Sequence, residues 1–323
     1  MCLKTPSFWY DTDMPTPFYM NAFSIIYNFF YHIHQKSKPA YKAKIPVICV
    51  GNIVAGGSGK TPITRKIYDD IKSLYPNKKI CILSRGYKGK LKGPLIVNPI
   101  VHSANDVGDE PLMLSNNAEV IISTNRKKGA RLAEKNGFDL IIMDDGLQNP
   151  GIYKDISIVV IDGHNGFGNE KLIPAGPLRE SLKNGLSRAN AFIINGNDSS
   201  DIKTKLPKDI PVFQSHIKSK EGSFDNSFEY VAFAGIAHPK SFEQSLNDAG
   251  IKYLEFHAFA DHHNYTEKNL SLLSGARLIT TEKDYARLPK NFIKDNHIDV
   301  LKIEAVWADK TALQNFLSFN INF

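Results

Sequence analysis

A glycine-rich loop ending in Lys60 and Thr61 has the residue types that bind nucleotide phosphates. The apolar run 45–50 leads into the loop and a helical pattern follows it, which is the arrangement of a strand–loop–helix phosphate site. Glycines let successive backbone N–H groups face phosphate oxygens, and the next helix adds its positive end. Lys60 can reach the β- and γ-phosphates, and Thr61 can offer a hydroxyl to Mg²⁺. We therefore expect a nucleotide to contact Val54, Ala55, Gly56, Gly57, Ser58, Gly59, Lys60 and Thr61.

Val54 departs from the general phosphate-loop pattern, which has a glycine five positions before Gly59. A glycine-rich turn is the alternative interpretation of this segment. Turns, however, do not need Gly-Lys-Thr directly after a strand. The departure weakens a general phosphate-loop match but leaves nucleotide binding as the favoured interpretation.

Two adjacent carboxylates, Asp144 and Asp145, follow the apolar run 138–143. Phosphoryl-transfer enzymes of the phosphate-loop class place an aspartate at a strand end to hold Mg²⁺. The pair could instead cap a turn with Gly146. Because the phosphate loop is present, we expect at least one of the two to bind the metal.

The remaining apolar runs predict an α/β fold with a parallel sheet covered on both faces. They are short, rich in β-branched residues and separated by amphipathic segments. The expected strands are 45–50, 80–83, 120–123, 140–143, 156–161 and 191–194, then a linking strand 211–217, and then 230–234, 253–256, 277–280 and 300–305, with a helix over 241–249.

We infer two α/β domains from the polar interruption after residue 194 and the second alternating set that follows it. The predicted divisions are an amino-terminal helix with a basic flank (1–44), a phosphate-loop domain (45–205), a linking segment (206–228) and a smaller α/β domain (229–323).

The amino-terminal run 18–31 is apolar and aromatic but shorter than the roughly 20 residues that span a bilayer. Aspartates precede it and bulky residues fill it, so it does not have the pattern of a cleaved signal. On a helix, its few polar residues form one stripe, and lysines follow. The stripe is Asn21, Ser24, Asn28 and His32, and the lysines are Lys36, Lys38, Lys42 and Lys44. The pattern fits a helix in the membrane interface, and a core-packing helix is the alternative.

The composition excludes several classes of protein. The chain has 323 residues, 42% apolar and 23% charged, which is globular and not disordered, collagen-like or disulfide-rich. Its net charge of +7 fits a nucleic acid, an anionic membrane or a phosphorylated substrate equally well. Of the three cysteines, Cys2, Cys49 and Cys81, the last two lie in apolar runs and are expected to be buried thiols.

Taken together, these motifs resemble the tetraacyldisaccharide 4′-kinase family, the lipid A 4′-kinases of Gram-negative bacteria. The resemblance extends from the aromatic amino-terminal helix to Thr280-Thr-Glu-Lys-Asp284, and six motifs in the same order make it specific. The family also lacks a glycine at the position of Val54. The six motifs are Val50–Pro62, Ser84-Arg-Gly-Tyr87, Gly108-Asp-Glu-Pro111, Asp144-Asp-Gly-Leu-Gln148, Leu172–Glu180 and Phe259-Ala-Asp-His262.

The resemblance implies an ATP- and Mg²⁺-dependent lipid A biosynthesis kinase that phosphorylates the 4′-hydroxyl of a tetraacylated glucosamine disaccharide 1-phosphate. It also implies a peripheral, monotopic protein on the cytoplasmic face of the bacterial inner membrane, which favours the interfacial interpretation of the aromatic helix. Its partners are then the lipid substrate and the membrane surface, with no nucleic acid and no obligate protein partner.

The resemblance also implies roles for residues that composition and spacing leave unassigned. It adds Glu180 to the metal shell, with the alternative that Arg179 and Glu180 form a surface ion pair. It pairs Asp109 with His262 as a catalytic dyad, and Lys60 acts with them. Because Asp109 and His262 lie in different predicted domains, we expect the domains to close over ATP. Candidate headgroup contacts are Arg85, Tyr87, Arg126 and Arg179.

Two other functions fit parts of the sequence. Asp261-His-His263 is also a signature of metal-dependent phosphoesterases, but the further Asp and His ligands of a metal pair do not accompany it. A nucleotide-switch ATPase that binds DNA would fit the basic pI, but no nucleic-acid motif occurs and the aromatic helix has no role there.

Overall fold

The structure is a computed structural model that describes residues 5–11, 13–36, 39–220, 222, 224–225, 227–273 and 277–323. Cys2 and Lys38 lie outside the described residues, as do three positions of the predicted linking segment. Cys49 and Cys81 are both buried free thiols, as expected from their apolar runs, and burial raises the pKa of Cys49 to about 11.

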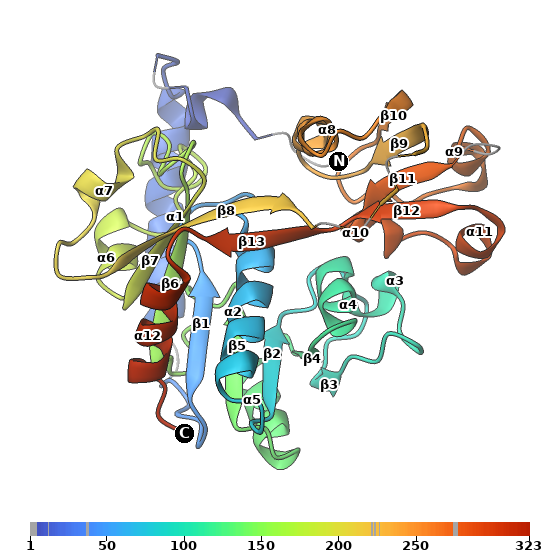
Figure 1. Cartoon of the computed structure of the whole chain (residues 1–323). Helices are drawn as coiled ribbons and strands as arrows, with labels where there is room; N and C mark the ends of the chain where they lie inside the picture. Colours follow the sequence, from blue (N-terminus) through green and yellow to red (C-terminus); the bar gives the residue numbers. More distant parts are fainter. Residues whose placement is uncertain are drawn as a thin grey trace.

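A large, mostly parallel sheet forms the centre of the molecule (Figure 1). In the described residues its strand order is β13-β8-β7-β6-β1-β5-β2-β4-β3. Only the two edge pairs, β13 with β8 and β3 with β4, are antiparallel. This confirms the α/β fold predicted from the apolar runs. The strands are β1 (Val47–Gly51), β2 (Ile80–Ser84), β3 (Leu95–Ile96), β4 (Glu119–Ile122), β5 (Leu140–Asp144), β6 (Ile156–Asp162), β7 (Ala191–Asn195), β8 (Val212–Ser219) and β13 (Ile303–Trp307).

Helices cover both faces of this sheet because alternate strand residues point to opposite sides. On one face α2 buries Ile63, Ile67 and Ile71, spaced by four residues so that they share one side of the helix. α12 packs on the same face (Figure 1), and α5 and α6 contribute to the apolar core of the opposite face. These helices and the shorter ones are η1 (Ser7–Trp9), α2 (Lys60–Leu74), α3 (Ala104–Val107), α4 (Asp109–Ser115), α5 (Arg126–Lys135), α6 (Leu182–Leu186), α7 (Ile202–Lys205) and α12 (Lys310–Asn320).

A second, smaller sheet stands beside the carboxyl ends of the large sheet's parallel strands (Figure 1). Its order among the described residues is β10-β9-β11-β12, and all its pairs are parallel. Its elements are β9 (Tyr230–Ala234), α8 (Pro239–Asp248), β10 (Tyr253–Ala258), α9 (Glu267–Ser271), β11 (Leu278–Thr281), α10 (Glu282–Tyr285), α11 (Lys290–Asp295) and β12 (Ile298–Leu301).

The structure corrects the single strand predicted over 300–305. The segment forms two strands that meet at Lys302: β12 completes the small sheet, whereas β13 pairs antiparallel with β8 of the large sheet. Burial of Trp307 explains the return, since its indole donates to Asp70 of α2 over 2.5 Å. Residues 303–323 therefore pack with the large sheet, although the predicted second domain extends to residue 323. The predicted linking segment likewise contains β8, an integral strand of the large sheet.

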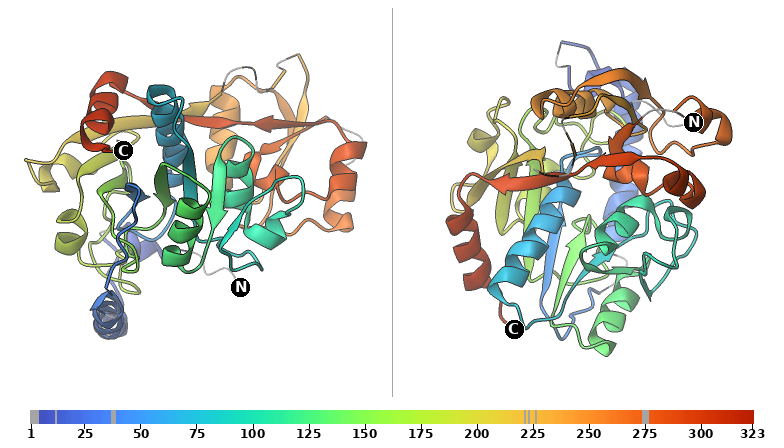
Figure 2. Two further views of the ribbon diagram at one scale, coloured as in Figure 1. Left: turned by 90° about the horizontal axis from the view of Figure 1, so that it is seen from below. Right: turned by 45° about the vertical axis from the view of Figure 1, so that its right-hand side comes forward.

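Helix α1 (Phe18–Lys36) lies on the side of the molecule opposite α2 and α12 (Figures 1 and 2). Only Ser24 of this helix is buried, and its hydroxyl donates to the Leu172 carbonyl over 2.7 Å. The apolar side chains point into solvent, which contradicts the core-packing alternative. They are Phe18, Tyr19, Phe23, Ile25, Ile26, Phe29, Phe30 and Ile33. None of the described helices is long and apolar enough to cross a membrane.

Candidate active site

The glycine-rich loop joins β1 to α2, so that Lys60 is the first residue of the helix at the carboxyl end of the central strand. Gly59 precedes it with φ +75°, and a Cβ there would lie 2.4 Å from the Asn195 side-chain nitrogen. Glycine suits this position because an L side chain would be strained at this φ and would displace the Asn195 side chain. The loop thus has the strand–loop–helix geometry expected of a phosphate site.

The rest of the predicted nucleotide loop divides into an anchored part and an open part. Val54 is buried and bridges Leu178, and the Ala55 N–H donates to the Pro177 carbonyl over 2.7 Å. Ser58 is fully buried, and its hydroxyl accepts a hydrogen bond from the Asn52 amide. In contrast Gly56 and Gly57 are exposed, and no heavy atom lies within 4 Å of a Cβ placed at Gly57. The glycines therefore form the part of the loop that a ligand can approach.

Asp144 ends β5 beside the loop and is buried. The Thr64 hydroxyl of α2 donates to its Oδ1 over 3.1 Å. Burial, together with the negative charges of Glu110 and Asp145, raises the pKa of Asp144 to about 7. A buried carboxylate among other acids needs a cation to be ionised stably, which is the environment of a metal ligand.

Asp145 adopts a left-handed backbone with φ +50°, which is uncommon outside glycine and typical of constrained functional positions. Arg179 donates to its Oδ1 over 2.8 Å. Burial opposes ionisation of Asp145, but Lys60 and Arg179 outweigh it and lower the pKa of the carboxyl. Burial also lowers the pKa of Lys60, and Asp145 counteracts this shift. Lys60, Asp145 and Arg179 thus form one charged group.

Glu180 has its own partners and does not pair with Arg179. Its carboxylate is fully buried, forms an ion pair with Arg188 and accepts a hydrogen bond from the Gln148 amide over 2.9 Å. The surface Arg179–Glu180 pair considered from the sequence is therefore absent. In the part of the chain that the structure describes, no cluster of three His, Cys, Asp or Glu side chains has the arrangement of a metal site.

Asp109 and His262 are in contact across the two sheets. His262 Nδ1 lies 3.1 Å from Asp109 Oδ2, although the residues are 153 positions apart in the chain. Asp109 opens α4 beyond the large sheet, and His262 follows β10 of the small sheet with φ +58°. Gly108 lets the start of α4 pack closely on the segment before it, because a Cβ there would lie 2.5 Å from the Tyr87 carbonyl. The contact expected from the resemblance is present.

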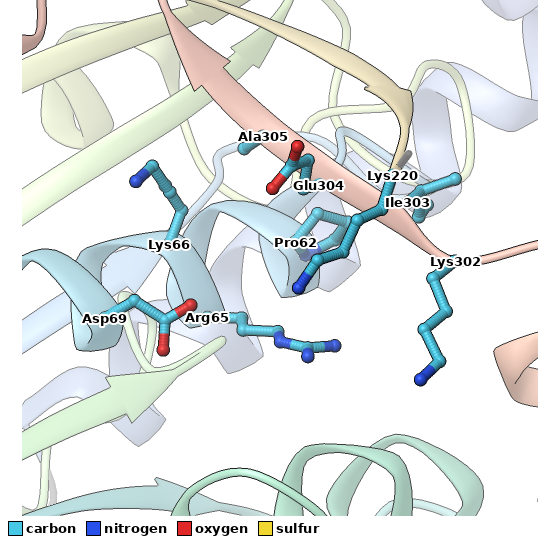
Figure 3. Close-up of a pocket in the computed structure, with 9 residues that line it drawn as sticks. All are labelled: Pro62, Arg65, Lys66, Asp69, Lys220, Lys302, Ile303, Glu304 and Ala305. Atoms are coloured by element: carbon cyan, nitrogen blue, oxygen red, sulfur yellow. The ribbon is translucent and has the colours of Figure 1, made fainter. Parts of the chain in front are cut away.

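Three further ion pairs join the small sheet's α10 region to the helices of the large sheet. Arg65 of α2 binds Glu282 over 3.1 Å, Lys283 binds Glu110, and Arg287 binds Asp109. Beside Arg65 lies a small polar cavity of about 60 Å³, between α2 and the point where the chain enters and leaves the small sheet (Figure 3). Its lining is Pro62, Arg65, Lys66, Asp69, Lys220, Lys302, Ile303, Glu304 and Ala305.

The predicted headgroup residues differ in their placement. Arg85 is exposed, and Tyr87 is 63% exposed with its ring 6.3 Å from that of His262 in an edge-on arrangement. Arg126 is instead buried: its Nη1 donates to the Ser123 carbonyl over 2.6 Å, and its Nε has no partner among the described residues. Burial, with Arg85 adding to it, lowers the pKa of Arg126 to about 10. An unpartnered buried guanidinium N–H is suited to an anion.

Four residues of this region were not predicted as site residues from the sequence: Glu110, Gln148, Lys283 and Arg287. Glu110 and Gln148 stand inside motifs that carry the resemblance, and Lys283 lies in the Thr-Thr-Glu-Lys-Asp segment at the end of the resemblance. Arg287 follows three positions after that segment. One turn of helix brings it back to Asp284, and this spacing was the only local signal available.

Known proteins of one family match this chain over almost its whole length. The tetraacyldisaccharide-1-P 4′-kinase family model matches residues 17–322. A tetraacyldisaccharide 4′-kinase of Parvibaculum lavamentivorans is 41% identical over 88% of this chain and 87% of its own. One from Rhodospirillum rubrum is 36% identical over 97% and 96%. The crystal structure of the "apo" form of LpxK from Aquifex aeolicus in complex with ATP matches with a TM-score of 0.76 at 28% identity, over 93% of this chain and 98% of that one.

Proposed function

Because this chain belongs to the tetraacyldisaccharide 4′-kinase family, we propose that the phosphate loop and the Asp109–His262 contact together form the active site for that reaction. The enzyme transfers the γ-phosphoryl group of ATP to the 4′-hydroxyl of tetraacyldisaccharide 1-phosphate, giving lipid IVA. The observation that carries the site assignment is the Asp109–His262 contact, which brings a candidate base to the side of the molecule where the phosphate loop opens.

ATP binding falls to the glycine loop and the start of α2. The exposed glycines offer backbone N–H groups, and Lys60 at the helix start adds a charge for the β- and γ-phosphates. Desolvation disfavours the charged form of Lys60, and the negative charge of an incoming phosphate would stabilise it as Asp145 does. Arg126 and Arg179 are placed near the same carboxylates and would bind the phosphates or the headgroup, with Arg85 and Tyr87 at the exposed side.

The residues at this end of the sheet fit Mg²⁺. Asp144, Asp145 and the Thr61 hydroxyl supply hard oxygen donors, and the buried Asp144 needs a cation. When bound, Mg²⁺ neutralises charge on the phosphate oxygens. Glu180 stays a prediction as a ligand, because joining the metal would require it to exchange Arg188 or Gln148. With those partners retained, Glu180 would orient Gln148 and the loop after β5.

The sugar hydroxyl needs a proton acceptor, and His262 is the better candidate of the dyad. Burial of Asp109 opposes its ionisation, but the hydrogen bond from His262 and the charge of Arg287 hold its pKa well below the usual range. A carboxylate of that kind is a weak base. Asp109 would therefore orient the imidazole through Nδ1, and Nε2 would take the proton.

The enzyme would bind the membrane surface through α1. Its aromatic face is exposed while Ser24 and Tyr27 bind the segment 172–179, whose end carries Arg179. Lys36 ends the helix and Lys42 and Lys44 follow it, and such cations suit the anionic surface of a membrane leaflet. The family resemblance gives the cytoplasmic face of the inner membrane, where the headgroup of the lipid substrate would be accessible.

The experiment that tests this function follows γ-labelled ATP with tetraacyldisaccharide 1-phosphate in detergent micelles. Wild-type enzyme should transfer label to the lipid, and omission of lipid should leave ATP largely intact. ATP hydrolysis at the same rate with and without lipid, with no labelled lipid, would favour the nucleotide-switch ATPase instead.

A further inference from the structure

Arg287 is a third member of the Asp109–His262 contact. Its Nε donates to Asp109 Oδ2 over 3.1 Å and its Nη2 binds the same oxygen, so three donors from two residues converge on Oδ2. The side chain is only 8% exposed. No hydrogen bond to Asp109 Oδ1 occurs among the described residues.

Arg287 is itself held rigidly by the small sheet. Its Nη1 donates to the Gly235 carbonyl over 2.7 Å and to Asp284 Oδ1 over 3.1 Å. The Gly235 carbonyl also accepts the backbone N–H of His262 over 3.0 Å. The Gly235 carbonyl therefore binds both residues that contact Asp109. The Arg287 guanidinium is held in place by the small sheet and does not depend on Asp109 for its position.

Among the charged and titratable side chains around Asp109 and His262, Arg287 is the cation that contacts both residues. Its Nη2 lies 3.4 Å from His262 Nδ1, while Asp261 Oδ2 lies 3.8 Å from Nε2 on the other side of the ring. Asp284 is fully buried and accepts hydrogen bonds from Tyr265 and Thr281. Lys283 acts on Asp109 only at longer range, because it is paired with Glu110.

We propose that Arg287 is a positioning residue for phosphoryl transfer, which keeps Asp109 ionised and thereby fixes the His262 tautomer that accepts the substrate proton. This inference rests on the proposed function. With Asp109 ionised, His262 Nδ1 carries the hydrogen and Nε2 has a free lone pair. A protonated Asp109 would donate to Nδ1 instead, so that Nε2 would carry the hydrogen and could accept no proton.

The step balances on this assignment. The 4′-oxygen forms its bond to the γ-phosphorus while the bond from that phosphorus to the β,γ-bridging oxygen breaks, and ADP leaves with the bonding electrons. The hydroxyl proton passes to His262 Nε2, and the imidazolium that results is stabilised by Asp109. Arg287 exchanges no proton at any stage and acts through Asp109 alone.

The test compares wild type with Arg287→Gln and Arg287→Lys. For Arg287→Gln we expect kcat to fall by about 10- to 100-fold, with KM for ATP changed less than about twofold. The acidic limb of the kcat/KM profile should move to higher pH, because without the cation the Asp109–His262 dyad takes up a proton more easily. Arg287→Lys should restore the position of this limb but not the full rate. Lysine keeps the positive charge but lacks the planar guanidinium that donates two hydrogen bonds to one carboxylate.

A double-mutant cycle separates positioning from folding. In a His262→Ala background, Arg287→Gln should lower kcat by less than about twofold, because the two residues act as one unit. Equal losses in both backgrounds, or an unshifted acidic limb, would overturn the inference. If Arg287→Gln does not fold, Arg287→Lys carries the same cycle. Failure of wild type to label lipid would reject the proposed function itself, whereas normal labelling with an unaffected Arg287→Gln rejects only this inference.

Discussion

At the residue scale, function depends on buried and half-buried charges that compensate one another. Lys60, Asp145 and Arg179 form one group, and Asp109, His262 and Arg287 form the other. Each group combines residues distant in the chain. The sequence analysis could find Lys60 and the paired aspartates, because their spacing is local and their chemistry is specific. It could not find Arg287, because the contact with Asp109 spans 178 positions and exists only in the folded molecule.

Lys60→Ala should lower kcat for lipid phosphorylation by about 10²- to 10³-fold, since it removes a preorganised cation from the developing phosphate charge. Lys72→Ala on the same helix is the matched control, because Lys72 binds only backbone carbonyls near the helix end and should leave kcat unchanged. The measurement is the initial rate of γ-label transfer at saturating ATP. Equal rates for Lys60→Ala and wild type would exclude Lys60 from catalysis.

The ionised Asp109 carboxylate makes the free energy of unfolding depend on pH in the acidic range. Its pKa is held below the usual range in the folded state, so its contribution is fully present above the unfolded value, near pH 4, and is lost as pH falls toward the folded value. Asp109→Asn should therefore lower the free energy of unfolding by about 3 kcal/mol at pH 7. Urea denaturation should show this difference shrinking below pH 4. A difference that is constant from pH 7 to pH 3 would contradict the ionised pairing.

At the scale of elements, the sequence predicted most strands within a residue or two, because buried parallel strands are continuous apolar runs between turns. The strand predicted over 300–305 was wrong at one point. Apolar residues stand on both sides of Lys302, and a single half-buried strand would show the same pattern, so that no local signal marks the change of sheet there. The orientation of α1 was also open, because an aromatic face fits a core or a membrane equally well.

Trp307 links β13 to α2 through a hydrogen bond, and loss of that bond should lower the free energy of unfolding. Trp307→Phe keeps the ring packing but removes the hydrogen bond to Asp70, a side chain that is only 2% exposed. Since Lys66 remains as a partner of Asp70, we expect the free energy of unfolding to fall by about 1–3 kcal/mol. Urea denaturation measures the change. Trp9→Phe, which removes a bond to a backbone carbonyl at the part-buried amino terminus, is the comparison and should cost less. Stability equal to wild type would show that the bond contributes nothing.

The exposed aromatic face of α1 should drive membrane binding. Replacing Phe29 and Phe30 by Ser should weaken partition onto anionic phospholipid vesicles by about tenfold per side chain, since burying a phenyl group is worth about 1.5 kcal/mol or more. Phe319→Ser on α12, where the side chain is 87% exposed, is the control and should bind as wild type does. Vesicle sedimentation measures the partition. Unchanged binding of the double variant would place the membrane contact elsewhere.

At the scale of the whole molecule, the two sheets are joined by chain and by charge. The chain leaves the large sheet after β8 and returns to it at β13. Because β8 and β13 pair antiparallel, the two connections lie side by side. The ion pairs of Arg65, Lys283 and Arg287 join the α10 region of the small sheet to α2 and α4 beside the large sheet. Asp109 and His262 are in contact in this structure, and closure of the two domains over ATP stays a prediction.

The most direct test of the central claim is the position of the phosphate in the product. Tandem mass spectrometry of the lipid formed by wild-type enzyme from ATP and tetraacyldisaccharide 1-phosphate assigns phosphate to each sugar. We predict a bisphosphate with one new group on the distal sugar at its 4′-oxygen, formed at similar rates by wild type and Lys72→Ala and far more slowly by Lys60→Ala. Release of inorganic phosphate with an unmodified lipid, or a new phosphate at any other position, would contradict the account.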